Sequence, residues 1–186
     1  NSDSQQGSKA NAYTYASAPT VNGVNPASGP MAGGTTITLS GTGFSGVPTV
    51  TVDGRVCSDV TLVNATTVTC RTPSSPAPGA AGVELTNPDS QKGSKANAFT
   101  YIAPVPALDG VSPARGPIEG GTLLTLSGSG FWGKPTVEVG DVACQAVTVV
   151  DAKTLTCTTG PGVKPGPVDV VLTDQVAQTA GVAAAF

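Results

Sequence analysis

Polar and apolar residues alternate along two stretches of the chain that have nearly the same sequence. The first covers residues 33–44 (GGTTITLSGTGF) and the second covers residues 120–131 (GGTLLTLSGSGF). A period of two places alternate side chains on opposite faces of a β-strand, and paired glycines favour turns at its ends. Each stretch is therefore predicted to form a turn, a half-buried strand, a second turn and a buried phenylalanine.

The same alternation predicts further short strands in the first half of the chain, at residues 20–24, 48–52, 66–72, 82–86 and 96–101. The pair Asp53-Gly54 between two such runs is typical of a tight hairpin. Proline-rich residues 73–78 predict a bend. Aromatic residues make up only 4% of the chain, whereas Thr, Val, Ala, Gly and Pro are abundant. This composition suits many short strands and predicts an all-β fold.

The whole pattern repeats at a constant distance. Cys144 follows Cys57 by 87 residues (144 − 57 = 87), and Phe131 follows Phe44 by the same 87. An unchanged offset means that neither copy carries an insertion, and the period is close to the size of an immunoglobulin-like sandwich. We therefore expect two tandem domains, at residues 16–101 and 102–186, joined by a short extended segment that contains Pro104 and Pro106.

The four cysteines fall into two equally spaced pairs, Cys57 with Cys70 and Cys144 with Cys157. We predict one disulfide in each repeat, which would stabilise a small domain by roughly 3 kcal/mol in the chain-entropy model. Disulfides indicate an oxidising compartment, and hence an extracellular, secreted or cell-surface protein. The alternative is a four-cysteine zinc site, which requires the two pairs to meet and usually shows closer spacing. The chain contains no apolar run long enough to span a membrane.

The order of short motifs in each repeat gives it a family resemblance. Its parts are Asn25-Pro26, Gly29-Pro30, Gly33-Gly34-Thr35, the run from Gly41 to Phe44, Cys57, and Cys70-Arg71-Thr72-Pro73. This order resembles the IPT/TIG family of immunoglobulin-like domains, and the match covers both repeats. The second repeat departs from it with Ser112 for the asparagine and Gly160 for the last proline. The resemblance implies two β-sandwiches. It leaves function open, because the family includes cell-surface receptors, bacterial surface proteins, starch-acting enzymes and transcription factors.

Catalysis is disfavoured by the residues present. The chain has no histidine, so neither a Ser-His-Asp nor a Cys-His arrangement can form. Two carboxylates alone could cleave a glycoside, but Asp59, Glu84 and Asp89 are replaced by apolar residues in the second repeat. The glycine-rich residues 29–35 lack the lysine of a phosphate-binding loop and precede a strand. We expect no enzyme, no cofactor and no metal site. The net charge of −3 also opposes nucleic-acid binding.

Two side chains are candidates for recognition. Trp132 is the only tryptophan and lies beside the predicted buried Phe131, so its indole is expected to face outward, where it could stack on a sugar or on a neighbouring domain. The alternative is a half-covered loop residue. Asn64-Ala65-Thr66 is a glycosylation sequon on a predicted loop, which has meaning only in a eukaryotic source and otherwise occurs by chance.

The first fifteen residues (NSDSQQGSKANAYTY) are nearly a copy of residues 87–101 (NPDSQKGSKANAFTY). They resemble the closing strand of a preceding repeat and are either the remnant of a longer array or a donor strand. In the second case Ala10, Ala12, Tyr13 and Tyr15 would add to the sheet edge of another molecule and build a filament.

Together these features predict a non-enzymatic structural or adhesive repeat module, a spacer or fibre-forming segment of a cell-surface protein. Its partners would be neighbouring repeats, copies of itself, or a surface glycan or protein. The alternative hypothesis is an accessory carbohydrate-binding module that uses Trp132.

Overall fold

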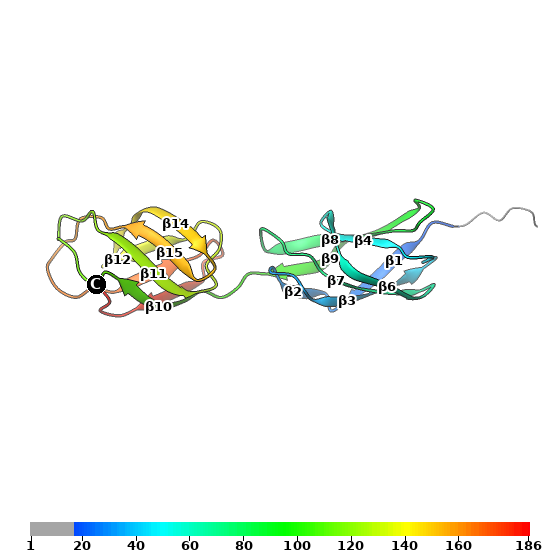
Figure 1. Cartoon of the computed structure of the whole chain (residues 1–186), viewed down its shortest axis with the longest axis horizontal. Coiled ribbons are helices and arrows are strands. Elements are labelled where there is room, and N and C mark those ends of the chain that lie inside the picture. The colour runs from blue at the N-terminus through cyan, green and yellow to red at the C-terminus, as the bar shows by residue number, and fades with distance from the viewer. Residues whose placement is uncertain (1–16) are drawn as a thin grey trace, which may run out of the picture. The chain divides into compact units, whose positions relative to one another are not determined.

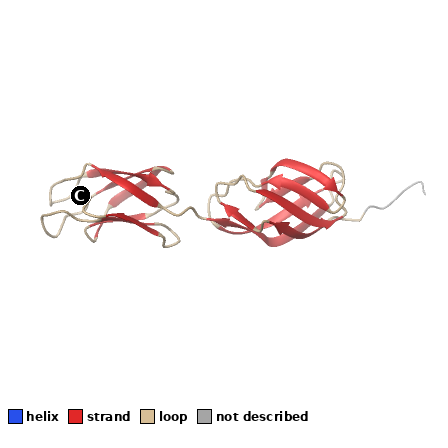
Figure 2. Ribbon diagram, turned by 90° about the horizontal axis from the view of Figure 1, so that it is seen from below, coloured by secondary structure: helices blue, strands red, loops and turns tan. Residues whose placement is uncertain are grey.

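The computed structural model describes residues 17–186, and all of its regular elements are strands (Figures 1 and 2). No helix is present among the described residues. The chain divides into two compact units, the first ending at Tyr101 and the second beginning at Ile102. The prediction of two tandem all-β sandwiches is confirmed.

The first unit is a sandwich of two antiparallel sheets. One sheet has the strand order β1-β3-β7-β6 and the other has the order β2-β9-β8-β4-β5. Its strands are β1 (Thr20–Asn25), β2 (Ser28–Pro30), β3 (Thr36–Thr42), β4 (Thr49–Val52), β5 (Arg55–Val56), β6 (Ser58–Asn64), β7 (Thr67–Arg71), β8 (Gly79–Thr86) and β9 (Lys92–Ile102).

The second unit has the same two-sheet plan. Its sheets have the orders β10-β11-β15-β14 and β13-β12-β16-β17. Its strands are β10 (Ala107–Ser112), β11 (Leu123–Ser129), β12 (Thr136–Val139), β13 (Val142–Ala143), β14 (Gln145–Asp151), β15 (Thr154–Thr158), β16 (Val170–Thr173) and β17 (Thr179–Val182).

The alternating sequence pattern explains how each unit buries its core. In β3 the side chains of Ile37 and Leu39 are fully buried, whereas Thr36 and Ser40 are exposed. Val50 and Val52 of β4 point inward from the opposite sheet and are also fully buried. A strand with one apolar face thus packs against a second such strand, and the apolar area removed from water stabilises the pair.

Glycine is required at the turn that precedes β3. Gly33 has a φ of 79°, and a Cβ atom there would lie 2.5 Å from the carbonyl carbon of Pro73. Gly120, with a φ of 80°, approaches Gly160 equally closely in the second unit. Because of this close approach, the loop at Pro73 in the first unit and the loop at Gly160 in the second unit occupy equivalent positions in their sandwiches.

The predicted hairpin at Asp53-Gly54 is confirmed. Both residues have a positive φ, 51° and 74°, as the favoured two-residue hairpin turn requires. In the second unit the same turn is made by Gly140 and Asp141, with φ values of 57° and 63°.

Six strands of the two units have bounds that differ by 87 residues throughout, namely β1 and β10, β3 and β11, β4 and β12, β5 and β13, β6 and β14, and β7 and β15. The units differ only at their closing edge. There β16 and β17 are shorter than β8 and β9, and residues 115–117, the counterpart of β2, form no strand. This edge carries the pocket described below.

Candidate binding pocket in the second unit

In the first unit, the end of β9 seals one corner of the sandwich. Phe99 and Tyr101 of β9 lie opposite Ala81 and Gly79 of β8, and their rings make an edge-to-face contact with centroids 5.1 Å apart. The N–H of Thr100 donates a 2.8 Å hydrogen bond to the carbonyl of Ala27, next to β2. Phe99 is fully buried and Tyr101 is 2% exposed, so the corner is closed.

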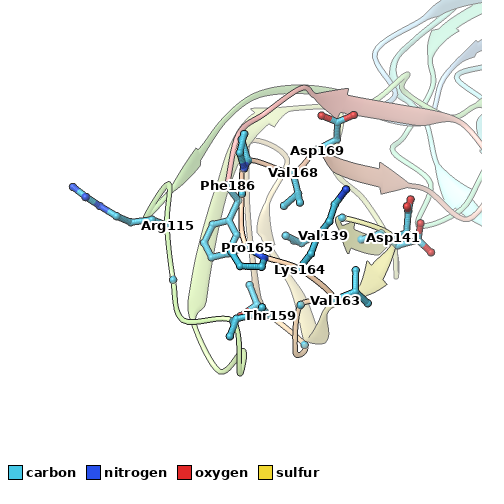
Figure 3. Close-up of a pocket in the computed structure, with 18 of the residues that line it drawn as sticks. Arg115, Val139, Asp141, Thr159, Val163, Lys164, Pro165, Val168, Asp169 and Phe186 are labelled. Atoms are coloured by element: carbon cyan, nitrogen blue, oxygen red, sulfur yellow. The ribbon is translucent and has the colours of Figure 1, made fainter.

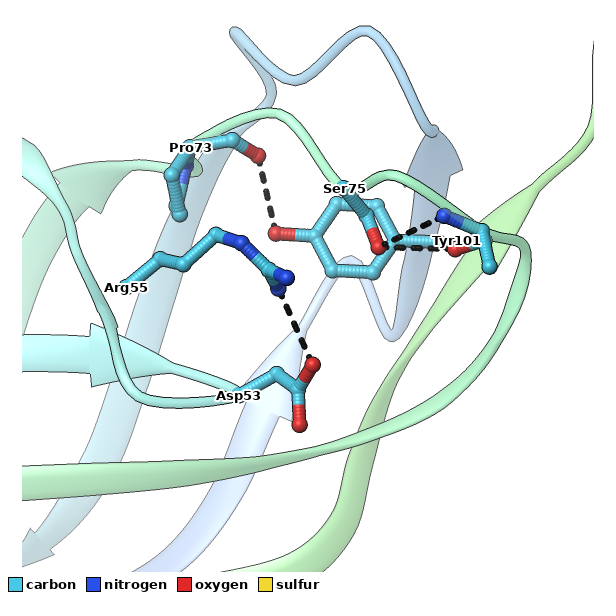
Figure 4. Close-up of polar contacts among 6 residues, drawn as sticks. Asp53, Arg55, Pro73, Ser75 and Tyr101 are labelled. Carbon is cyan, nitrogen blue, oxygen red and sulfur yellow. Dashed lines mark hydrogen bonds and ion pairs between the residues drawn. The ribbon is translucent and has the colours of Figure 1, made fainter. Parts of the chain in front are cut away.

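The Tyr101 hydroxyl has a partner inside this corner. It donates a 2.8 Å hydrogen bond to the carbonyl oxygen of Pro73 (Figure 4). Beside the ring, Arg55 Nη1 lies 2.9 Å from Asp53 Oδ2. Burial raises the pKa of Tyr101, and negative charge on Cys57 would raise it further, while the Arg55 guanidinium opposes the rise. The phenol is therefore held neutral as a hydrogen-bond donor.

In the second unit, the backbone at this corner takes a different course from that of β9. Strand β17 ends at Val182, and the following residues bend back to Val168. There the N–H of Val168 donates to the carbonyl of Phe186 over 2.8 Å, and the N–H of Ala185 donates to the carbonyl of Val168 over 3.0 Å. Phe186 lies at the position of Phe99, because the two residues are 87 positions apart (186 − 99 = 87).

A pocket of about 760 Å³ lies at this corner of the second unit (Figure 3). Apolar side chains of Val139, Val168 and Phe186 line it, while Lys164 and Asp141 supply charges at its edge (Figure 3). Further lining residues include Ala114, Arg115, Ile118, Glu138, Thr159, Gly160, Val163, Asp169 and Val171. The charges of both signs nearly balance, so the pocket has no strong preference for an anion or a cation.

The pocket leaves part of the second core uncovered. Phe186 and Cys144 are half-buried, whereas their counterparts Phe99 and Cys57 are 0% and 5% exposed. Val139 is 8% exposed, while its counterpart Val52 is fully buried. These differences lie at the edge where β16 and β17 are shorter than β8 and β9.

The paired cysteines contact each other within each unit. They are thiols in this structure. A hydrogen bond from Cys70 lowers the pKa of Cys57, and the same contact together with burial raises the pKa of Cys70. Cys144 and Cys157 repeat these directions. The contact suits a disulfide, which stays a prediction. Residues 17–186 contain no group of three or more His, Cys, Asp or Glu side chains that could hold a metal ion, so the described part of the chain offers no zinc site.

The prediction that Trp132 faces outward is wrong. The residue is only 9% exposed, and its Nε1 atom has no hydrogen-bond partner. Sequence reasoning assumed that one of two adjacent residues must face solvent, but Phe131 and Trp132 are both buried because they follow the strand in an irregular loop rather than in its pleat. A largely covered indole offers no stacking platform to a sugar.

The other candidates from the sequence lie apart from the pocket. Asn64 is exposed at the end of β6, and its Oδ1 accepts hydrogen bonds from the N–H and the hydroxyl of Thr66 at 2.9 and 2.8 Å. Its glycosylation stays a prediction. The proposed donor residues Ala10, Ala12, Tyr13 and Tyr15 lie outside the described residues.

Comparison with known proteins decides the family. The model of the IPT/TIG domain matches residues 19–101 and 106–185. The chain belongs to the IPT/TIG family. Human plexin-A3 is 34% identical over 167 residues, which cover 82% of this chain and 9% of that protein. Human fibrocystin-L is 37% identical over 117 residues, which cover 60% of this chain and 3% of that protein. The chain therefore spans less than a tenth of the length of these relatives.

A solved structure supports the fold at greater distance. The surface glycan-binding protein PbSGBP-B of Prevotella bryantii matches with a TM-score of 0.59 and 17% identity, over 89% of this chain and 41% of that chain.

No described helix of this chain is long and apolar enough to cross a membrane.

Proposed function

We propose that this chain is a non-catalytic structural module of an extracellular protein, a spacer or adhesive segment built from IPT/TIG repeats. The observation that carries the proposal is the repeat itself. Two sandwiches recur with an offset of 87 residues and identical bounds for six strands. The unit that both copies share carries no recognised site. Repeating it makes the protein longer and adds surface, but it adds no chemical activity.

The paired cysteines support the extracellular setting. In each unit they connect neighbouring parts of the core across a short loop and already contact each other. Disulfides at these places would form and persist outside the cell. The family relationship agrees with this setting, since cell-surface receptors and bacterial surface proteins belong to the same family.

The carbohydrate-binding alternative loses its main support. It was based on an exposed Trp132, and that side chain is buried. The likeness to a glycan-binding protein is a likeness of fold, at 17% identity. We therefore do not assign a glycan to this chain.

The extracellular setting can be tested by labelling intact cells of the source organism with an antibody against the second unit. We expect labelling without permeabilisation. Labelling that requires permeabilised cells would contradict the proposal. Mass spectrometry of the native protein, alkylated before reduction, adds a second measurement, because an extracellular module should carry Cys57–Cys70 and Cys144–Cys157 as disulfides.

The spacer role can be tested by stretching single molecules between handles at the two ends. Each disulfide would withhold 13 residues (70 − 57 = 13) from extension, about 45 Å at roughly 3.3–3.6 Å per residue. We expect two separate unfolding steps, each longer by this amount after reduction. A single step at negligible force would count against a load-bearing spacer.

A further inference from the structure

A bulge in β9 of the first unit leaves one backbone N–H group outside the ladder. The register of β8 and β9 shifts between Ala81 and Val83, so that Asn97 has no paired residue. Asn97 is exposed and has a left-handed φ of 51°. Among residues 17–186, no side chain accepts a hydrogen bond from its N–H. The extra residues of a bulge are commonly left unpaired in this way.

The second unit has the same backbone conformation at this position, but there the N–H has an acceptor. Ala184, the counterpart of Asn97, has a φ of 50°. Its N–H donates a 2.8 Å hydrogen bond to Oδ1 of Asp169. In the first unit the place of Asp169 is taken by Gly82 (169 − 82 = 87), which has no side chain. The two units therefore share one donor, and only the second carries the carboxylate that accepts from it.

A small pocket of about 330 Å³ lies at Gly82. Its other lining residues come from the neighbouring strands and turns, namely Thr51, Asp53, Gly54, Val83, Glu84, Ser94, Lys95 and Ala96. Ala96 directly precedes Asn97, so the unpaired N–H borders the pocket. A Cβ atom on Gly82 would lie 3.8 Å from its nearest non-neighbouring atom, the carbonyl oxygen of Lys95. The pocket therefore has room for a polar group beside this N–H.

The charges around this pocket suit an anion. Arg55 Nη1 lies 2.9 Å from Asp53 Oδ2, and Lys92 Nζ lies 2.8 Å from Glu84 Oε1, so both carboxylates have a cationic partner. Lys95 forms no ion pair in the described part of the chain. Three cations and two carboxylates leave a net charge of +1 (3 − 2 = 1). An incoming carboxylate would therefore meet acidic groups that are already compensated.

We propose that this pocket of the first unit binds the carboxylate of an aspartate or glutamate side chain on a partner protein, with the Asn97 N–H as the donor. The occupant is identified by the second unit, where the side chain of Asp169 makes the same contact from within the chain. A hydrogen bond to an ionised carboxylate is roughly twice as strong as one between neutral groups. The inference goes beyond the spacer role, because it gives the first unit a partner of defined chemistry.

Water is the alternative occupant, because Asn97 is exposed and water can accept a hydrogen bond from its N–H. The two cases differ in their response to salts. A site that binds carboxylate saturates as the carboxylate concentration rises, whereas hydration of the N–H does not depend on which anion is present.

Amide NMR spectra of the full chain test the site. Sodium acetate is the probe, because acetate carries the same carboxylate as an aspartate side chain, and sodium chloride at equal ionic strength is the control. We expect the Asn97 amide signal to shift with acetate in a saturable way and to stay in place with chloride. The Ala184 amide should respond to neither salt, because Asp169 already accepts from it. Equal responses of Asn97 to the two salts would overturn the proposal in favour of water.

Two exchanged substitutions provide matched controls. Gly82→Asp should place a carboxylate beside the Asn97 N–H and abolish the acetate response there. The backbone tolerates this change, because Gly82 is not among the residues with a positive φ. Asp169→Gly should do the reverse and make the Ala184 amide respond to acetate. If Asn97 responds unchanged in Gly82→Asp, or if Ala184 stays silent in Asp169→Gly, the assigned site is wrong.

Capped amino acids separate a protein side chain from a free small carboxylate. Aspartate with an acetylated amino group and an amidated α-carboxyl group keeps only its side-chain carboxylate, and it should shift the Asn97 signal. Asparagine capped in the same way lacks the charge and should not. A response to acetate without a response to capped aspartate would contradict a protein partner. None of these outcomes changes the surface-labelling and stretching results, so the spacer proposal is tested separately.

Discussion

Phe99 and Phe186 stand 87 residues apart at the same place in two sandwiches, and yet one is fully buried and the other is half-buried. Six strands have equivalent bounds in the two units, and the turns that carry Gly33 and Gly120 have the same conformation, whereas β16 and β17 beside Phe186 are shorter than β8 and β9. In the first unit β9 continues past Phe99, and the buried side chain of Tyr101 covers this corner. The comparison teaches that equivalent bounds in six strands do not by themselves give equal burial at this corner.

Removal of the two phenylalanines should give the largest and most unequal effects. We expect Phe99→Ala to lower the free energy of unfolding of the first unit by about 3–5 kcal/mol, because it empties a fully buried site. Phe186→Ala should lower the free energy of unfolding of the second unit by less than half as much, because the Phe186 ring is already partly exposed to water in the folded protein. Urea unfolding of each variant measures both values. Equal losses would show that the second corner is as well packed as the first.

Reduction of the predicted disulfides should affect both units alike, by roughly 3 kcal/mol each. The rates of reduction of the two disulfides should differ, because Cys144 is half-buried and Cys57 is 5% exposed. We expect Cys144–Cys157 to be reduced first in a time course followed by alkylation and mass spectrometry. If Cys57–Cys70 were reduced first, the claim that the second unit is the more exposed one at this corner would be contradicted.

Thr72 and Thr159 provide a pair with equal expected effects. Their hydroxyl oxygens accept hydrogen bonds from the N–H groups of Thr35 and Thr122 at 3.1 and 3.0 Å, and both side chains are buried. Thr72→Val and Thr159→Val each leave an N–H group without a partner, which costs about 1–3 kcal/mol. If the two substitutions lowered the free energy of unfolding by different amounts, the two units would differ outside the closing corner as well.

Tyr101→Phe should have the smallest effect at neutral pH, a loss of about 1 kcal/mol for one hydrogen bond. At high pH the advantage of the wild type over the Phe variant shrinks. The folded state raises the pKa of Tyr101 above the ordinary value of 10.0, so its contribution to stability is complete below pH 10 and is lost as the pH rises through that value and beyond. The wild-type first unit should therefore lose stability more steeply above pH 10 than the Phe variant. If the free energies of unfolding of the wild type and the Phe variant fell in parallel with rising pH, a buried Tyr101 phenol would be contradicted.

Much of the fold could be predicted from local pattern. The alternation in residues 36–40, the Asp53-Gly54 turn and the offset between Cys57 and Cys144 each reflect short-range physics or simple repetition. The candidate site could be predicted only in part. The offset of 87 residues places Phe186 at the position of Phe99, which locates the corner where the two units can be compared. Which side chains would then lose cover depends on how two sheets meet, and no local pattern in Val139 or Cys144 indicates it.

Trp132 was mispredicted for a related reason. The rule that neighbouring residues face opposite ways holds inside a pleated strand, but residues 130–135 form no strand. Outside regular structure, the direction of a side chain is set by packing between distant segments. The size and apolar character of the indole favour burial, and this was the better guide.

Hydrogen exchange at the closing edge tests the central claim most directly, namely that the first sandwich is sealed and the second is open at the same corner. In the first unit, Ala81 and Phe99 pair in the β8–β9 ladder, between its register shift and the Gly79–Tyr101 pair. In the second unit, those of Val168 and Phe186 lie beside the pocket. We expect Ala81 and Phe99 to exchange only on global unfolding, and Val168 and Phe186 to exchange at least about tenfold faster by local opening. Equal protection at the two edges would contradict the account.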